Sequence, residues 1–542
     1  MRHGGKILVD QLKIQGVERV FCVPGESYLA ALDGLYESGI ETIVGRQEGG
    51  VAMMAEAHGK LTGTPGIAFV TRGPGATSAS AGVHVAFQDS TPMILFVGQV
   101  ASDQRDREAF QEVDYRQMYE PLAKCAAEID RIDRIPEYIS RAFHVAVSGR
   151  SGPVVLSLSE DMLSATADVL DALDALPANP ARQMVCDEEV SEVIDRLKRA
   201  QRPFVIVGGS GWSAEAANNL GYFAAALGLP VGVSFRCQDY LDNRHPNYVG
   251  DVGIAPNPEL AEQVRNSDCL LVLGARLGEM TSSGYRLFDV PNPKQGLIHI
   301  HADADELGRV YRPEFGLACR AADFLARAVG LTEGMTKQSP SVARKSYEAW
   351  QEPLPTPGAV KMEQVIHHLS EVLTENAIIT NGAGNYAAWL HRYFCYKSYR
   401  TQLAPTSGSM GYGLPAAVAA KLNHPDREVI CLAGDGCFQM TMQEFGTASQ
   451  YGAKIIVIVV NNGVYGTIRM HQQRDYPDRP SATTMLNPDF AALATCYGCN
   501  GEVVTETQDF EAAFARAQSS EKSTIIELRT DPAAVSPRTP ID

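Results

Sequence analysis

Short runs of apolar residues alternate along the whole chain with segments of helical periodicity. Each run is four to six residues long. Such runs, each followed by a helical pattern, are typical of buried strands in parallel sheets. We therefore predict an α/β chain of doubly wound parallel sheets. The predicted strands are 19–23, 67–71, 93–97, 154–158, 204–207, 269–273, 297–301, 377–380, 429–433, 455–460 and 524–528.

Two stretches interrupt this alternation and are predicted to be linkers. Residues 171–182 are rich in Ala, Pro and Asp, and residues 335–358 are polar and contain four prolines. Such composition disfavours regular elements. We therefore expect three domains, at residues 1–170, 185–333 and 358–530. Three prolines follow Thr530, so the tail is predicted to be either a lid or a disordered end rather than a further element.

Polar residues follow two neighbouring strands of the last domain. Gly434-Asp435-Gly436 comes directly after the run 429–433, and Asn461-Asn462 ends the run 455–460, with a predicted helix at 438–451 between them. Both sets are expected at the carboxyl edge of a parallel sheet, where α/β proteins bind ligands. A carboxylate and an amide oxygen there suit Mg²⁺, which shares oxygen ligands with phosphates. A plain crossover with a glycine turn is the alternative, and the paired asparagines favour the metal site.

Composition narrows the class of protein. The chain has 542 residues, 45% of them hydrophobic, and a formal net charge of −17. This charge argues against nucleic acid or an anionic membrane as a partner, because a negative field repels polyanions. The 11 cysteines are scattered and odd in number, which favours a reducing cytoplasm over a disulfide framework. No apolar run approaches the ~18 residues of a membrane span and no signal peptide is recognisable, so we expect a cytoplasmic protein.

The first domain contains a carboxylate at the start of a predicted helix. Glu48 stands in Arg46-Gln47-Glu48-Gly49-Gly50, between a strand end and a helix rich in Ala and Met. A glycine turn, Gly73-Pro74-Gly75-Ala76-Thr77, follows the strand 67–71. Taken alone, Glu48 is interpreted as a carboxylate favoured by the helix dipole, and the turn as an ordinary loop between a strand and a helix.

Several motifs, in order along the chain, resemble those of thiamine diphosphate enzymes, and in particular the acetohydroxyacid (acetolactate) synthase branch. In the first domain they are VPGES, RQEGG, TRGPGAT, DSTPMILFVGQV and AFQE, and in the last they are GSMGYGLPAA, the GDG and NN pair and NNGVYG. The resemblance covers nearly the whole chain, specifically in the outer domains and loosely in the middle. It implies a pyrimidine-binding domain at 1–170, a central Rossmann-like domain at 185–333 and a diphosphate-binding domain at 358–530.

The resemblance also implies roles for individual residues. Asp435, the Asn462 side chain and the Val464 carbonyl would bind Mg²⁺, which clamps the diphosphate. Glu48 would hydrogen-bond the aminopyrimidine and start proton removal from the coenzyme, which requires a carboxyl whose pKa is raised by burial. Met410 would support the bent coenzyme. The full set implied for the cofactor is Gly25, Glu48, Ala383, Gly384, Asn385, Tyr386, Gly408, Met410, Gly434, Asp435, Gly436, Cys437, Asn462, Val464, Tyr465 and Gly466.

Substrate residues are implied by the same resemblance. For two of them, Gln111 and Lys124, a solvated loop position is the alternative. Thr467 and His471 stand where typical synthases have Met and an acceptor-selecting Trp, so a different substrate, larger or more polar, is expected. Asn385-Tyr386 likewise replaces the usual Gln-His. The implied substrate residues are Ser27, Phe110, Gln111, Lys124, Thr467 and His471.

The implied reaction is decarboxylation of a 2-oxo acid, followed by carboligation of the enamine to a second carbonyl compound. The first domain lacks the His-His pair of pyruvate-decarboxylase-type enzymes, and His367-His368 lies in the third domain on a helix predicted to be exposed. The alternatives are a 2-oxo acid decarboxylase, a flavin-linked 2-oxo acid oxidase and a non-catalytic subunit. FAD is possible but not expected, because residues 209–214 match only the weak pattern G-x-G-x-x-A.

The resemblance further implies self-association. In this family the active sites lie between subunits, with the first domain of one chain facing the last domain of another. A dimer or a dimer of dimers is therefore expected, with small-molecule carbonyl compounds as the other partners.

Overall fold

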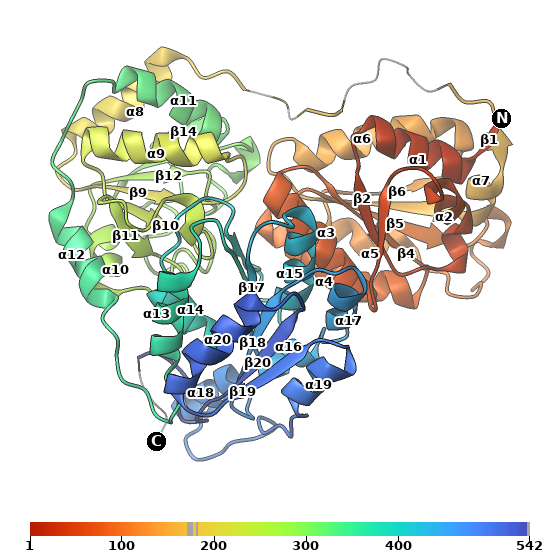
Figure 1. Ribbon diagram of the computed structural model, residues 1–542. Coiled ribbons are helices and arrows are strands. Elements are labelled where there is room, and N and C mark those ends of the chain that lie inside the picture. Colours follow the sequence, from red (N-terminus) through yellow and green to blue (C-terminus); the bar gives the residue numbers. More distant parts are fainter. Residues whose placement is uncertain (171–176, 180, 182, 539–542) are drawn as a thin grey trace.

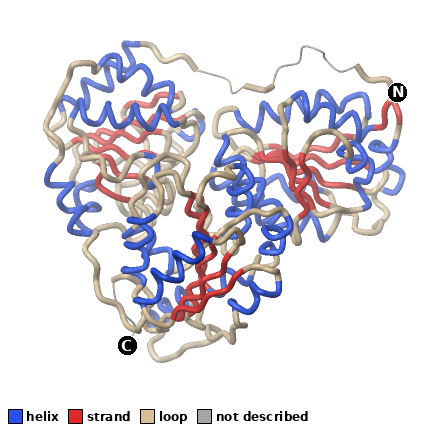
Figure 2. The backbone as a smooth tube through the Cα atoms, in the orientation of Figure 1, coloured by secondary structure: helices blue, strands red, loops and turns tan. Residues whose placement is uncertain are grey.

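The chain folds into three lobes, each built on one parallel sheet (Figure 1). The computed structural model describes residues 1–170, 177–179, 181 and 183–538. Within these residues there are three six-stranded sheets, and all their ladders are parallel. Figure 2 shows the strands as three separate groups with helices around them. The predicted α/β class with three doubly wound parallel sheets is confirmed.

The first lobe has the strand order β3-β2-β4-β5-β7-β6, and a short antiparallel pair β1–β8 ties its start to its end. Its strands are β1 Arg2–His3, β2 Arg19–Cys22, β3 Glu41–Val44, β4 Gly66–Val70, β5 Met93–Gln99, β6 Cys125–Ile129, β7 Pro153–Ser159 and β8 Thr166–Ala167. Its helices are α1 Gly4–Ile14, α2 Leu29–Leu35, α3 Glu48–Thr62, α4 Pro74–Asp89, α5 Tyr115–Tyr119, α6 Ile135–Val147 and α7 Glu160–Ser164.

The central lobe has the order β11-β10-β9-β12-β13-β14, which is the 3-2-1-4-5-6 arrangement of dinucleotide-binding folds. Its strands are β9 Pro203–Val207, β10 Val231–Val233, β11 Tyr248–Asp251, β12 Cys269–Leu273, β13 Gly296–His301 and β14 Phe315–Ala318. Its helices are α8 Asp187–Arg199, α9 Ala214–Leu227, α10 Pro258–Arg265, α11 Ala321–Leu331 and α12 Ser341–Trp350.

The third lobe has the order β16-β15-β17-β18-β20-β19, which repeats the pattern of the first. Its strands are β15 Ile378–Asn381, β16 Gln402–Leu403, β17 Val429–Gly434, β18 Ile456–Asn461, β19 Asn500–Val504 and β20 Thr524–Arg529. Its helices are α13 Met362–Val372, α14 Tyr386–Tyr393, α15 Gly413–Asn423, α16 Asp435–Gln439, α17 Glu444–Gln450, α18 Gly466–Asp475, α19 Phe490–Cys496 and α20 Phe510–Ser519.

Three local expectations differ from the structure. The predicted linker 335–358 contains helix α12, whose Tyr347 is buried with its ring 5.1 Å from that of Tyr248. The prolines flank this helix instead of preventing it. The predicted helix 438–451 is two helices, α16 and α17, separated by a turn. His367 and His368 are half-buried, and His368 packs against Phe510. Of the other predicted linker, residues 171–176, 180 and 182 lie outside the described residues.

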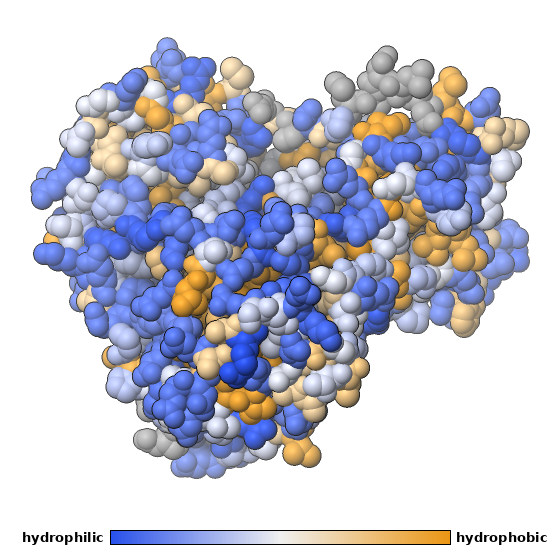
Figure 3. All heavy atoms as spheres, viewed as in Figure 1, coloured by the Kyte–Doolittle hydropathy of each residue, from blue (hydrophilic) through white to orange (hydrophobic). Residues whose placement is uncertain are grey.

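The first and third lobes share one hydrophobic core. Helices α3 and α15 pack between the two sheets through small residues, among them Ala52 and Ala55 of α3 and Ala416 and Ala417 of α15, all fully buried. Small side chains allow the two helices to approach closely, and burial of their faces stabilises the pairing of the lobes. Figure 3 shows one face of the molecule as mainly hydrophilic, with hydrophobic atoms visible where the lobes meet and in patches on the first and third lobes.

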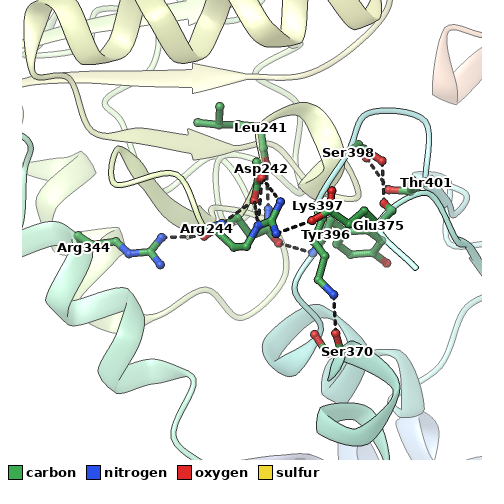
Figure 4. Close-up of polar contacts among 11 residues, drawn as sticks. Leu241, Asp242, Arg244, Arg344, Ser370, Glu375, Tyr396, Lys397, Ser398 and Thr401 are labelled. Carbon is green, nitrogen blue, oxygen red and sulfur yellow. Dashed lines mark hydrogen bonds and ion pairs between the residues drawn. The ribbon is translucent and has the colours of Figure 1, made fainter. Parts of the chain in front are cut away.

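The central and third lobes are joined by polar contacts (Figure 4). Asn243 and Tyr396 exchange two hydrogen bonds, from the Asn243 amide to the Tyr396 carbonyl at 2.8 Å and from the Tyr396 amide to Asn243 Oδ1 at 2.9 Å. Arg244 forms ion pairs with Asp242 and with Glu375 of the third lobe. The Asn243–Tyr396 pair is buried, so it contributes more to the contact between the lobes than the exposed ion pairs. Of the helices that the structure describes, none is long and apolar enough to span a bilayer.

A buried carboxyl group of the first lobe contacts Tyr412 of the third lobe, which directly follows the glycine loop 408–411. Glu56 of α3 is fully buried, Thr91 Oγ1 donates to its Oε1 at 2.8 Å, and the Tyr412 hydroxyl donates to its Oε2. Burial raises the pKa of Glu56 to about 7, against the opposing charge of Lys60. Folding therefore favours the protonated form of this group.

The stability that Glu56 contributes is present at acidic pH and is lost as the pH rises through about 7. Glutamine keeps an acceptor for Thr91 and cannot ionise. We expect Glu56→Gln to reduce the loss of melting temperature between about pH 5 and about pH 8 by about 2 °C. Differential scanning calorimetry measures this change. The control is Glu511→Gln on the exposed side of α20, and an unchanged pH dependence in Glu56→Gln would contradict the assignment.

Candidate active site

A buried carboxylate marks the carboxyl edge of the third sheet. Gly434, the last residue of β17, pairs with Val460 of β18, so Asp435 and Asn462 follow adjacent strands. Asp435 is 3% exposed. Its Oδ1 accepts from the Gly436 amide at 2.8 Å, and its Oδ2 accepts from the Gly463 amide at 2.8 Å. Burial raises the pKa of Asp435, and these hydrogen bonds oppose the shift.

The donor set at this edge fits a hard divalent cation. Its members are the Asp435 carboxylate, the Asn462 side-chain oxygen and the Val464 carbonyl, all oxygens. The Asn462 oxygen also accepts from the Val464 amide at 3.1 Å, which orders the loop after β18. Among the described residues no three His, Cys, Asp or Glu side chains cluster at metal-binding distance. A cation here would therefore complete its shell with oxygens of a phosphate ligand, as Mg²⁺ does.

Asn487 is a part of this site that sequence reasoning missed. Its Nδ2 donates to Asp435 Oδ2 at 2.7 Å and to Asn461 Oδ1 at 2.8 Å, and its Oδ1 accepts from Gln439 Nε2 at 2.9 Å. Asn461 in turn donates to Glu527 Oε1 at 2.9 Å. These contacts fix the rotamer of Asp435. Asn487 lies in a loop between α18 and α19 with no strand or glycine signal around it, so only the folded chain shows its role.

A cavity of about 260 Å³ opens at this edge. Every residue of the third domain that was predicted to bind the cofactor lines it, together with Thr467. Gly434 approaches the Tyr386 ring so closely that a Cβ there would lie 2.9 Å from it. The tail also lines the cavity through Ala534 and Val535, which sequence reasoning did not assign.

Three of the predicted cofactor residues form hydrogen bonds within the protein. The Tyr386 hydroxyl accepts from the Gly382 amide at 3.0 Å and donates to Cys437 Sγ at 3.3 Å, so it is already engaged inside the protein. Asn385 accepts at Oδ1 from Thr467 Oγ1 at 3.0 Å. The amide of Gly436 is directed to Asp435. These groups shape the loop around the cavity.

The predicted residues of the first domain, apart from Lys124, gather at the carboxyl edge of its own sheet. Glu48 starts α3, and its Oε1 lies beside Gly75, 3.2 Å from where a Cβ would stand. Ser27 is buried and hydrogen-bonds Thr71 Oγ1 at 2.9 Å, next to Gly25. Gln111 packs against Gly73, and Phe110 is 72% exposed.

These residues do not line the cavity of the third domain within one chain. Neither Glu48 nor Gly25 belongs to its walls. The edge that carries Glu48 instead packs against α17 of the same chain. There Glu444, fully buried, accepts from the Arg46 amide at 3.0 Å, and a Cβ on Gly50 would lie 2.8 Å from its carboxylate. Glu444 is a second residue that the sequence did not reveal, because its partner is some 400 residues away.

Lys124 lies apart from the other predicted substrate residues. It precedes β6, whereas Glu48 follows β3, so the two are at opposite edges of a parallel sheet. Its Nζ donates to the carbonyls of Val145 and Ser148, both at 2.6 Å, and burial lowers the pKa of Lys124 to about 8. The structure therefore gives it neither a solvated loop position nor a place beside the cavity.

Comparison with known proteins agrees with this architecture. Models of the thiamine pyrophosphate enzymes match residues 2–118 (N-terminal binding domain), 190–328 (central domain) and 382–528 (C-terminal binding domain). The chain is also similar to the acetolactate synthase large subunit of Corynebacterium glutamicum, at 30% identity over 95% of this chain and 84% of that protein.

The chain belongs to the thiamine pyrophosphate enzyme family. A further relative is the acetolactate synthase large subunit of Haemophilus influenzae, at 29% identity over 97% of this chain and 94% of that protein. Another is the acetolactate synthase isozyme 2 large subunit of Escherichia coli, at 28% identity over 98% of this chain and 96% of that protein. The predicted family and branch are thereby confirmed, and thiamine diphosphate is the family's cofactor.

The position of Asn487 in this thiamine pyrophosphate enzyme leads to a test. Leucine has a similar size and cannot donate to Asp435, so the metal carboxylate would lose its orientation. We expect Asn487→Leu to weaken Mg²⁺ binding by about tenfold, the usual effect of removing a partner of a metal ligand. Calorimetric titration of the metal into protein with thiamine diphosphate measures it. Asn500→Leu, at the far end of β19, is the control, and unchanged Mg²⁺ affinity in Asn487→Leu would refute the role.

Proposed function

We propose that this protein is a Mg²⁺- and thiamine diphosphate-dependent enzyme that decarboxylates a 2-oxo acid and joins the remaining fragment to a second carbonyl compound. The observation that supports this most is the convergence of the predicted cofactor residues of the third domain on one cavity beside the buried Asp435. The relatives named acetolactate synthase support the same class of reaction.

The coenzyme supplies the carbon nucleophile that stabilises the charge left when CO₂ departs, and the protein supplies position and electrostatics. Asp435, Asn462 and the Val464 carbonyl would hold Mg²⁺, and the loop 383–386 with the start of α16 would hold the diphosphate. Met410 and the Gly408 carbonyl line the same cavity and would hold the bent coenzyme. Glu48 would exchange a proton with the aminopyrimidine ring.

The active site would require two chains. Glu48 lies at one sheet edge and Asp435 at another, and within one chain they do not share a cavity. A second copy that places its first domain against this third domain would complete the site. We propose domain limits of 1–170, 185–333 and 358–530. Each chain would then contribute its first domain to one active site and its third domain to another.

The flavin-linked oxidase is the second candidate function, and one observation bears on it. A cavity of about 500 Å³ lies between the first and central lobes, lined by Gly209, Gly211, Trp212 and Arg320. It stands at the carboxyl edge of the sheet with the dinucleotide-binding strand order. Visible flavin absorbance of the purified protein, with 2-oxo acid turnover that needs an electron acceptor, would favour this candidate. Retention of thiamine diphosphate without turnover of any 2-oxo acid would favour the non-catalytic subunit.

Glu48→Gln tests the proton role. Glutamine preserves size and hydrogen bonding but cannot take up a proton, so we expect thiamine diphosphate and Mg²⁺ to bind within about twofold of wild type while turnover falls by about 10²–10⁴-fold. Calorimetry and CO₂ release from 2-oxo acids measure the two quantities. Glu41→Gln, on the exposed side of β3, is the matched control. Full turnover in Glu48→Gln would show that the assignment is wrong.

Mixing two inactive variants tests the shared site. We expect Asp435→Ala to lose cofactor retention and activity. A mixture of Asp435→Ala and Glu48→Gln chains, dissociated and reassembled, would form hybrids in which one site has both native residues. Such a mixture is expected to regain about a quarter of wild-type activity. If both residues served the same chain's site, no hybrid would be active.

A further inference from the structure

A second cavity adjoins the proposed cofactor cavity on the side of the central lobe. It measures about 420 Å³ and shares Ala383, Gly384, Asn385, Gly408 and Thr467 with the cofactor cavity. Its walls are mostly apolar and aromatic, and the largest rings in them are those of Phe235, Tyr248, Tyr347 and Trp350. His471 of α18 also lines it. A ligand in this space would lie directly against the cofactor.

Three arginines from separate parts of the chain line this cavity, which we call the arginine cavity. Arg236 follows β10, Arg392 lies in the last turn of α14, and Arg538 belongs to the tail. Arg236 and Arg392 are 5% and 6% exposed. Arg538 is exposed on its outer side. Burial lowers the pKa of all three guanidinium groups, and Arg236 and Arg392 are the two that the protein holds away from water.

The hydrogen bonds of these arginines go to carbonyl oxygens. Arg236 donates to the carbonyls of Pro405 and, at 2.9 Å, Gly382, and its buried Nε has no partner. Arg392 donates from Nε to the Trp350 carbonyl at 2.9 Å and from Nη1 to the Pro537 carbonyl at 3.1 Å. Carbonyl dipoles satisfy N–H groups but leave the positive charge without a counter-ion.

Arg538 completes the group in the same way. It donates to the carbonyls of Ala255 and Pro256, and its guanidinium lies 4.8 Å from the centre of the Trp350 ring. Arg392 covers the same ring at 3.9 Å. Two cations on one indole repel each other, so the arrangement gains from an anion nearby.

No carboxylate of the described residues forms an ion pair with these arginines. Within the described part of the chain, none of the three arginines has an acidic oxygen within 4.0 Å. Asp251 is the acidic residue among the lining residues, and its carboxylate accepts from the Gly253 amide at 2.7 Å. Burial raises the pKa of Asp251 to about 7, so it offsets the charge of the arginines incompletely. A buried cation without a counter-ion is costly, and arginine binds carboxylates well.

We propose that the arginine cavity binds the second substrate, and that this substrate is an anion with a bulky apolar body, such as an aryl-substituted 2-oxo acid. The proposal rests on the proposed function, because it assigns the acceptor side of that reaction. The arginines would hold the carboxylate, the aromatic walls would hold the body, and Thr467 and His471 would leave the room that a larger acceptor needs next to the cofactor.

Binding to the full-length protein tests the proposal. The protein is loaded with Mg²⁺ and 3-deazathiamine diphosphate, a cofactor analogue whose ring carbon cannot attack the substrate. It is titrated in a calorimeter with phenylpyruvate and with 1-phenyl-2-butanone, in which an ethyl group replaces the carboxylate. We expect the anion to bind at least about tenfold more tightly, and Arg538→Gln to remove about that factor for the anion alone.

Two controls locate the effect. Arg516→Gln changes the net charge equally, and Arg516 pairs with Glu502 on α20, outside the walls of the cavity; it is expected to leave both affinities unchanged. Trp350 lines the arginine cavity, whereas Trp212 and Trp389 line the other two. Fluorescence quenching by phenylpyruvate should therefore disappear in Trp350→Phe, and equal quenching in that variant would overturn the location.

The remaining outcomes separate the two proposals. Equal affinity of the wild-type protein for both ligands, or an equal loss for both in Arg538→Gln, would overturn the anion site. CO₂ release from a series of 2-oxo acids, pyruvate among them, by the holoenzyme without an added electron acceptor tests the proposed function by itself. Selective phenylpyruvate binding without any consumption of 2-oxo acids would contradict the proposed function and would still support the anion site.

Discussion

The proposed site depends on one electrostatic constraint, the burial of the Asp435 carboxylate at the end of β17. Backbone amides of Gly436 and Gly463 and the Asn487 side chain donate to it. Within the described residues no cationic side chain forms an ion pair with it. Neutral donors repay only part of the desolvation of a charge. A divalent cation shared with a phosphate would remove the remainder, which explains why loops from distant segments converge on this carboxylate.

A geometric constraint then separates the two halves of the chemistry. The first and third sheets have the same strand order, and they pack through the alanine-rich faces of α3 and α15. This packing fixes the edge that carries Glu48 against α17 through Glu444, and it leaves the edge that carries Asp435 open. Two similar domains joined in this way present one half of a site on each side. Pairing of two chains, as proposed above, would use both halves.

The sequence predicted what depends on local pattern and missed what depends on long-range contacts. Every predicted strand was found, because short apolar runs between helical segments rarely form anything but buried strands. The glycine-rich loops that follow the strands of the third domain line the cavity. Helix α12 was missed because its flanking prolines dominated the composition of the segment. Asn487 and Glu444 were missed because their partners are remote in sequence. Lys124 was assigned by motif, and a motif does not specify which edge of a sheet a residue occupies.

The charge of the arginine cavity also depends on contacts between residues that are distant in sequence. Its three arginines come from the central lobe, the third lobe and the tail, so their charges are brought together only in the folded chain. Arg538 and Arg392 share the Trp350 ring of α12, the helix that the composition of its segment concealed. The tail also covers the cofactor cavity through Val535. An anion that attracts Arg538 would therefore also hold the tail over the cofactor, so that binding of the second substrate and exclusion of water from the reacting carbon would occur in one step.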